Sequence, residues 1–199
     1  RDSGGICIAD EVQMGFGRVG THTWCFETQG VVPDIVTMGK PMGNGHPMAA
    51  VVTTREIADA YDEGGVTYFN TFGGNPVSCA AGLAVLEVLE DEKIKDNTVK
   101  MSKQLFDGLE VLKTRYPVMA DVRGLGLYIG IELVTDRETL APATTLAGNV
   151  VELMKARGIL LNTNGYDNNI IKIKPPLIVG EADIQRLLST FDEVLEQLQ

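Results

Sequence analysis

The sequence is short of the residues that mark several classes of protein. It has three cysteines and two histidines, and no apolar run approaches the ~20 residues of a membrane helix. Cys7, Cys25 and Cys79 form no CxxC pair, which favours reduced thiols in a cytoplasmic protein, and neither histidine has the neighbours of a metal site. No basic segment leads into an apolar one at the N-terminus. We expect no metal and a protein neither inserted nor exported, located in the cytoplasm, or in mitochondria if a eukaryotic parent has lost a transit segment.

Positive charge is also scarce. The 199 residues hold 17 Lys+Arg against 27 Asp+Glu, for a formal net charge of −10. Binding to nucleic acid or to anionic lipid requires a basic surface, so neither a nucleic-acid partner nor a membrane is expected. The 44% hydrophobic content is that of a globular chain, and a small molecule or another protein is the expected partner.

The first part of the chain has the pattern of a parallel α/β domain. Apolar runs predict buried strands at residues 6–10, 35–38 and 48–53, and Thr54 is placed to cap a helix at residues 55–62. Leucines at three- and four-residue spacings then predict a long helix over residues 77–115, with a break near residues 96–97. We therefore expect residues 1–115 to form the C-terminal part of a large α/β domain, including a linking helix.

The remaining residues, 116–199, predict a small α+β domain. Alternating apolar residues at 127–131 indicate a half-exposed strand. The other expected elements are helices at 143–157 and 181–198 and strands at 159–161 and 170–173.

Two charged residues stand at the carboxyl ends of predicted strands, Asp10 and Lys40. Strand ends of this kind face a common crevice in open α/β sheets. A desolvated lysine amine attacks carbonyl groups, and a carboxylate can keep a pyridine nitrogen protonated. From position alone, however, an ordinary ion pair or two solvated charges is the better interpretation.

Four sequence motifs instead favour a functional role for Asp10 and Lys40. IADEVQMGFGRVG, WCFETQGVVPDIVTMGKPMGNGHPMAAV, NTFGGNPVSCAAGLAVL and RGLGLYIGIEL follow one another with ordinary spacing. In this order they closely resemble the second half of class III aminotransferases, which are fold-type I enzymes dependent on pyridoxal 5'-phosphate (PLP). The resemblance covers essentially the whole chain. It implies part of the large PLP-binding α/β domain of fold type I, followed by a small α+β C-terminal domain.

The resemblance also implies roles for individual residues. Lys40 matches the lysine that forms the Schiff base with PLP, and Asp10 matches the partner of the pyridine nitrogen. Val12 is expected on one face of the ring and Gln13 near its phenolic oxygen, although core packing and a surface amide would look the same in the sequence. Thr71 is expected at the cofactor phosphate of a neighbouring subunit. A homodimer with shared active sites follows from that assignment.

Within the family, the chain is most similar to the phospho-lyase branch, and the segments VPDIVTMGKPMGNGHP and IIKIKPPL carry this resemblance. Many class III transaminases carry, where this chain has Lys172, an arginine that grips the substrate carboxylate, and lysine is a poorer clamp. Lys172 and Lys174 also alternate with isoleucines, so an exposed strand face explains them equally well. The expected reaction is elimination of phosphate from an amino-phosphate such as phosphoethanolamine or phosphohydroxylysine. The alternatives are an ω-amino acid transaminase and, from another class, a non-catalytic fragment or oligomerisation module.

Two further expectations concern the completeness of the site. His46 either positions a phosphate or the cofactor or, in the preferred interpretation, fixes the local backbone. The resemblance places a phosphate-binding loop and a ring-stacking aromatic residue before Arg1, so we expect a fragment of a longer enzyme. By itself the chain is expected to retain PLP weakly or not at all.

Overall fold

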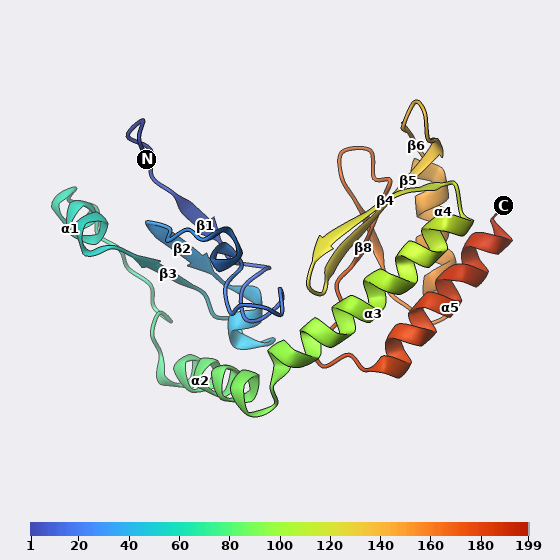
Figure 1. Cartoon of the computed structure of the whole chain (residues 1–199). Helices are drawn as coiled ribbons and strands as arrows, with labels where there is room; N and C mark the ends of the chain where they lie inside the picture. The colour runs from blue at the N-terminus through green and yellow to red at the C-terminus, as the bar shows by residue number, and fades with distance from the viewer. Residues whose placement is uncertain (199) are drawn as a thin grey trace. The chain divides into compact units, whose positions relative to one another are not determined.

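The computed structural model describes residues 1–198, which divide into two compact units (Figure 1). The first unit is Arg1–Lys95 and the second begins at Asp96. Each unit has its own sheet. Among the described residues, no helix combines the length and the apolar character needed to cross a membrane.

A three-stranded sheet forms the centre of the first unit. Strands β1 (Ile8–Asp10), β2 (Ile35–Met38) and β3 (Ala50–Thr53) lie in that order, with β1 parallel and β3 antiparallel to β2. The expectation of a parallel α/β domain is therefore wrong for β3. The connection at residues 39–49 contains only the short 3-10 helix η2 (Lys40–Gly43), whereas a parallel return requires a crossover of about a dozen residues or more.

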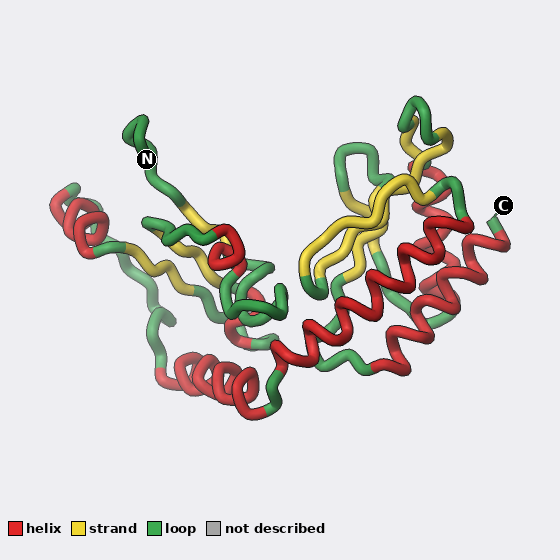
Figure 2. The backbone as a smooth tube through the Cα atoms, viewed as in Figure 1, coloured by secondary structure: helices red, strands yellow, loops and turns green. Residues whose placement is uncertain are grey.

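Side chains at the helix N-termini explain where the helices of the first unit begin. Helix α1 (Arg55–Glu63) starts after Thr54, whose hydroxyl accepts a hydrogen bond from the Ile57 amide at 3.4 Å, as the sequence predicts. Helix α2 (Pro76–Asp91) is capped by Asn75 in the same way. The predicted long helix breaks after Asp91, earlier than expected, and α3 (Ile94–Arg115) follows (Figure 2).

The first unit leaves many apolar side chains exposed. Ile6 and Ile8, expected to be buried, are each 60% exposed, and β1 is an edge strand among the described strands. Phe69 and Phe72 are 83% and 79% exposed. The first unit therefore buries its strands much less than their apolar sequence predicts.

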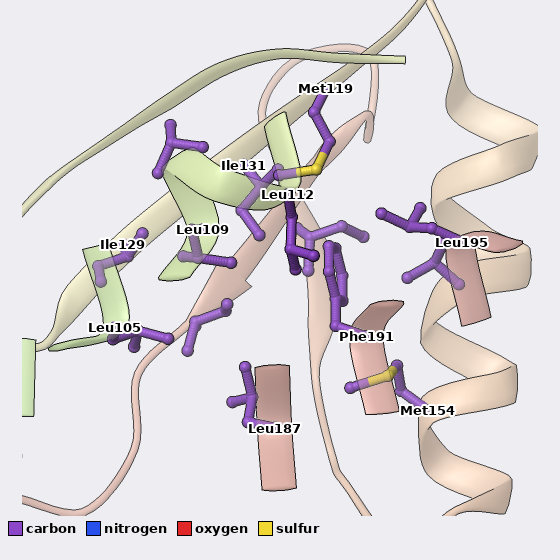
Figure 3. Packing of buried hydrophobic residues seen from close by; sticks show 14 of the residues in the cluster. Leu105, Leu109, Leu112, Met119, Ile129, Ile131, Met154, Leu187, Phe191 and Leu195 are labelled. Atoms are coloured by element: carbon purple, nitrogen blue, oxygen red, sulfur yellow. The ribbon is translucent and has the colours of Figure 1, made fainter. Parts of the chain in front are cut away.

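The second unit is an α+β layer structure. Its antiparallel sheet has the order β4 (Met119–Leu125), β5 (Tyr128–Asp136), β8 (Ile170–Ile173) and β7 (Asn162–Asn164), and β6 (Ala141–Pro142) pairs with β5. Helices α3, α4 (Thr144–Ala156) and α5 (Glu181–Gln197) pack against one face. Figure 3 shows the apolar core between them, in which Leu105, Ile131 and Phe191 are fully buried.

The strand predicted at residues 159–161 is wrong, because the first of these residues, Ile159, completes the end of α4. Gly158, with φ of +80°, donates its N–H to Lys155, and the Ile159 N–H bonds the Met154 carbonyl. This is the hydrogen-bond pattern of a Schellman cap. The strand β7 begins only at Asn162.

Helix α3 joins the second core through one face. Leu105 and Leu109 on that face are fully buried, and Met101 nearly so. The compact units consequently divide earlier in the chain than residue 115, where we expected the boundary between the two domains. The assignment of residues 1–115 to a PLP-binding domain stays a prediction.

Candidate active site

The carboxyl ends of β1 and β2 bring two predicted site segments to one edge of the first sheet. Asp10 lies opposite Thr37 in the parallel ladder, and the Glu11 amide continues it by donating to the Thr37 carbonyl at 2.9 Å. One step further, a Cβ built on Gly39 would lie 3.7 Å from Cγ1 of Val12. The Val12 side chain therefore lies beside the residue that precedes Lys40. Edges of this kind are where open α/β sheets bind ligands.

The Asp10 carboxylate is exposed and held in one orientation. Its Oδ1 accepts a hydrogen bond from the Val12 amide at 3.1 Å, which forms an Asx turn. We find no other hydrogen bond to this carboxylate from the described residues. Asp10 can thus accept a further hydrogen bond from a ligand. Gln13 lies half-buried in the loop that follows.

Glu11 points to the opposite side and fixes that loop. The residue is 2% exposed, and its carboxylate accepts hydrogen bonds from the Cys25 amide at 3.0 Å and the Phe26 amide at 2.8 Å, at the start of the 3-10 helix η1 (Cys25–Gln29). Burial and the negative charge of Glu11 raise the pKa of the Cys25 thiol. Glu11 is not among the site residues predicted from the sequence. The alternation of side chains along a strand could have indicated it, since neighbours of an outward Asp10 face inward.

Lys40 stands exposed at the start of a tightly coiled loop. Its φ of +21° is unusual for a residue with a side chain. Three backbone hydrogen bonds follow in series: Met42 to Gly39 at 2.8 Å, Asn44 to Pro41 at 3.1 Å, and His46 to Gly43 at 2.9 Å. The loop holds Lys40 in a conformation that it would seldom adopt alone, as is frequent at functional sites.

Two side chains hold this Lys40 loop, residues 39–48, against α2. His46 Nε2 lies 2.7 Å from Oγ of Ser78. Met48 packs so closely on Gly82 that a Cβ there would lie 2.8 Å from its sulfur. The contact with Ser78 favours the preferred, structural interpretation of His46.

Thr71 lies in an exposed turn before α2. Asn70 closes the turn, since its Oδ1 accepts from the Phe72 amide at 3.0 Å. Asn75 then donates through Nδ2 to the Phe72 carbonyl at 2.7 Å and to Oγ of Ser78 at 2.8 Å. A hollow of about 970 Å³ beside the turn is lined by residues of β2, β3, α1 and the turn itself, and neither Asp10 nor Lys40 lines it.

Lys172 belongs to the second unit. It lies in β8 opposite Gly130 and Asn162, between the buried Ile171 and Ile173, on the sheet face away from the helices. The alternation expected from the sequence is therefore present, but the face that carries Lys172 is half-buried and not fully exposed. The Lys172 amine has neither a hydrogen bond nor an ion pair with any described residue.

Arg123, the neighbouring cation on that face, forms ion pairs with two acidic side chains. Arg123 bonds Asp121 at 2.8 Å and Glu132 at 2.6 Å, and these hydrogen bonds raise the pKa of its guanidinium. Lys172 is thus a half-buried cation available to an anionic ligand. Among the described residues, no cluster of His, Cys, Asp and Glu has the grouping of a metal site.

Comparison with known proteins agrees with the motifs. The chain is 50% identical over 196 residues to the alanine–glyoxylate aminotransferase 2-like protein of Drosophila melanogaster, covering 98% of this chain and 40% of that protein. It is 48% identical over 198 residues to the ethanolamine-phosphate phospho-lyase homolog 1 of Caenorhabditis elegans, covering 98% and 42%. The chain thus spans about two fifths of the curated relatives it matches.

A solved structure gives the same result. A phospholyase from Arthrobacter, in complex with phosphoethanolamine, superposes with a TM-score of 0.94 and 41% identity, covering 100% of this chain and 47% of that one. The α/β fold of part of a fold-type I enzyme is therefore confirmed. The aminotransferase class-III family model matches residues 1–195, and the chain belongs to that family.

Proposed function

We propose that, within the whole enzyme, this chain supplies the lysine and the carboxylate that hold PLP. Support comes from family membership and from the parallel pairing of β1 and β2, which brings Asp10, Val12 and the Lys40 loop to one sheet edge. The residues fit the cofactor, since Lys40 presents an exposed amine and Asp10 an exposed carboxylate with room for a further hydrogen bond.

Each residue has a distinct task in this proposal. When bound, PLP supplies an aldehyde that captures amines and a pyridine ring that accepts electrons. Asp10 keeps the ring nitrogen protonated, Val12 contacts a ring face, and Gln13 donates to the phenolic oxygen. The Lys40 amine holds the cofactor and then accepts the proton that leaves the nitrogen-bearing carbon of the substrate.

We propose a phospho-lyase reaction on an amino-phosphate. Its main support is the match to the Arthrobacter phospholyase, whose structure contains phosphoethanolamine, and the Caenorhabditis relative is named for the same reaction. After the proton has left, the phosphate departs from the adjacent carbon with the electrons of the C–O bond. Lys172 is the candidate to bind this phosphate as a point charge.

Transamination is the second candidate, because the Drosophila relative is named an alanine–glyoxylate aminotransferase 2-like protein. Incubation of the full-length enzyme with phosphoethanolamine separates the two. A phospho-lyase releases inorganic phosphate and ammonia without a keto acid, whereas strict dependence on a keto-acid acceptor would exclude the lyase.

Substitutions test the residues and the non-catalytic alternative. Lys40→Ala in the full-length protein is expected to abolish product formation, and full activity of this variant would favour a non-catalytic module. Lys172→Ala is expected to raise the KM for the amino-phosphate about fivefold or more, the effect of a lost charge-assisted bond. Lys174→Ala is the control for Lys172→Ala. The Lys174 amine is already in contact with an aromatic ring, since it lies 5.8 Å from the centre of the Tyr128 ring.

We further propose a homodimer in which Thr71 binds the phosphate of the partner's cofactor. Its exposed position on a turn supports this role. Mixed dimers of Lys40→Ala and Thr71→Ala subunits would then contain one intact site and regain activity. If Thr71 acts within its own subunit, mixing restores nothing.

We propose a cytoplasmic location, since Cys7, Cys25 and Cys79 are all free thiols. Fractionation of cells that express the full-length protein tests this against a mitochondrial location.

A further inference from the structure

We propose that His46 is a positioning residue which, through Ser78 and Asn75, couples the Lys40 loop to the turn that carries Thr71. The inference rests on the proposed function, in which Lys40 and Thr71 serve cofactor sites. It adds a residue outside the set that contacts PLP.

The Lys40 loop meets α2 at two positions on one face of the helix. His46 contacts Ser78 at 2.7 Å and Met48 contacts Gly82. Ser78 and Gly82 are four residues apart on α2 and so lie one above the other. The polar contact fixes direction, whereas the thioether contact fills space and tolerates sliding. His46 therefore determines where the end of the loop lies along α2.

The hydrogen bonds continue from Ser78 to the Thr71 turn. A serine hydroxyl has one donor and two acceptor positions. Ser78 accepts from Asn75 Nδ2 at 2.8 Å and still has its proton, or a second lone pair, for His46 Nε2. The same Asn75 amide group donates to the Phe72 carbonyl at 2.7 Å, while its oxygen caps α2.

The chain of contacts is short and partly shielded from water. His46, Asn75 and Ser78 are each half-buried. Two loops that lie far apart in the sequence are thus fixed to the first turn of one helix. A displacement of that turn would move both the lysine and the threonine. Loss of His46 is expected to weaken the hold on PLP without removing any group that contacts it.

The test measures PLP affinity, so it needs no turnover. Full-length apoenzyme is titrated with PLP by fluorescence for wild type, His46→Ala, Ser78→Ala, the double variant and His46→Gln. Each alanine variant is expected to weaken binding about fivefold, as for one lost hydrogen bond, and the double variant no further. The glutamine Nε2 can replace the imidazole Nε2, so His46→Gln should bind within about twofold of wild type.

The matched control is His22→Ala, because His22 has one side-chain hydrogen bond within residues 1–198, to its neighbour Thr21 at 2.9 Å. It should leave PLP affinity unchanged. A second readout is hydrogen exchange of residues 70–75 in the apoenzyme, which should become faster in His46→Ala and Ser78→Ala. This readout does not depend on PLP.

Two results would overturn the coupling alone. One is wild-type PLP uptake together with unchanged exchange at residues 70–75 in His46→Ala. The other is a loss of PLP affinity in the double variant equal to the product of the fold-losses in the two single variants, because independent residues give additive free energies. If the wild-type enzyme takes up no PLP, the proposed function itself fails, and the role of His46 fails with it.

Discussion

Replacement of Glu11 is expected to loosen the loop that joins β1 to η1. The carboxylate is 2% exposed and accepts two hydrogen bonds, from the Cys25 amide at 3.0 Å and the Phe26 amide at 2.8 Å. A hydrogen bond to a charged group contributes about 1.5–3 kcal/mol. Glu11→Ala is therefore expected to destabilise the folded loop by about 3–5 kcal/mol, because both amides lose their acceptor.

Two probes report on this loop in the chain itself. Trp24 is the single tryptophan of the sequence, and its ring contacts Phe16 edge-to-face at 5.0 Å between centres. In Glu11→Ala the fluorescence emission of Trp24 should shift to the red. The unfolding transition that this emission reports should also occur at a lower urea concentration. Cys25 is the second probe, because burial and Glu11 raise the pKa of its thiol. Glu11→Gln removes the charge, so Cys25 should react faster with a thiol reagent at a fixed mildly alkaline pH.

Glu27 provides the control. Its exposed carboxylate also accepts a backbone hydrogen bond, from the Trp24 amide at 2.8 Å, but it remains in contact with water. Glu27→Ala is expected to cost about 1 kcal/mol or less. Equal losses for the Glu11 and Glu27 variants would refute the argument, because burial would then add nothing to the bond.

Three further predictions concern the second unit. Phe191→Ala, at a fully buried position, should lower the free energy of unfolding by about 3–5 kcal/mol in urea titrations. Burial tends to raise the pKa of Asp192, but the hydrogen bonds that its carboxylate accepts from Tyr116 and Arg115 lower this pKa overall. The carboxylate therefore stabilises the fold above about pH 4, and this stabilisation is lost as the pH falls through the lowered pKa. The difference in Tm between wild type and Asp192→Asn should accordingly disappear in acid. Gly124→Ala should lower the free energy of unfolding by about 2 kcal/mol or more, which a lower Tm would report, because at φ of +156° the added Cβ would lie 2.2 Å from the Tyr128 carbonyl oxygen. Gly148→Ala is the control and should not destabilise the fold, because the space around Gly148 is open.

The elements that the sequence predicted well are those set by local chemistry. Thr54 caps α1 as its hydroxyl and position indicate, and β8 spans the predicted residues 170–173. Residues 159–161 were mistaken for a strand because apolar composition alone cannot distinguish a strand from the apolar end of a helix cap. The Gly158 that precedes them was the available signal.

Contacts across long separations could not be predicted. His46 and Ser78 are 32 residues apart, and nothing in their spacing indicates that a loop folds back on a helix. Likewise, the antiparallel direction of β3 depends on how the coiled Lys40 loop returns the chain. The family motifs predict Asp10, Lys40 and Thr71 as site residues without these contacts, because a motif specifies positions and not the network that supports them.

The two units hold their functional loops by different means. In the second unit, an extensive apolar core fixes the sheet that presents Lys172. In the first, Glu11, Asn75 and His46 hold the Asp10, Thr71 and Lys40 segments through directional hydrogen bonds. A packing defect spreads through a dense core, whereas loss of one hydrogen bond in the first unit displaces only the loops that this bond connects. Substitutions in the second unit should therefore affect global stability, and those in the first should affect the geometry of the proposed cofactor site before the fold.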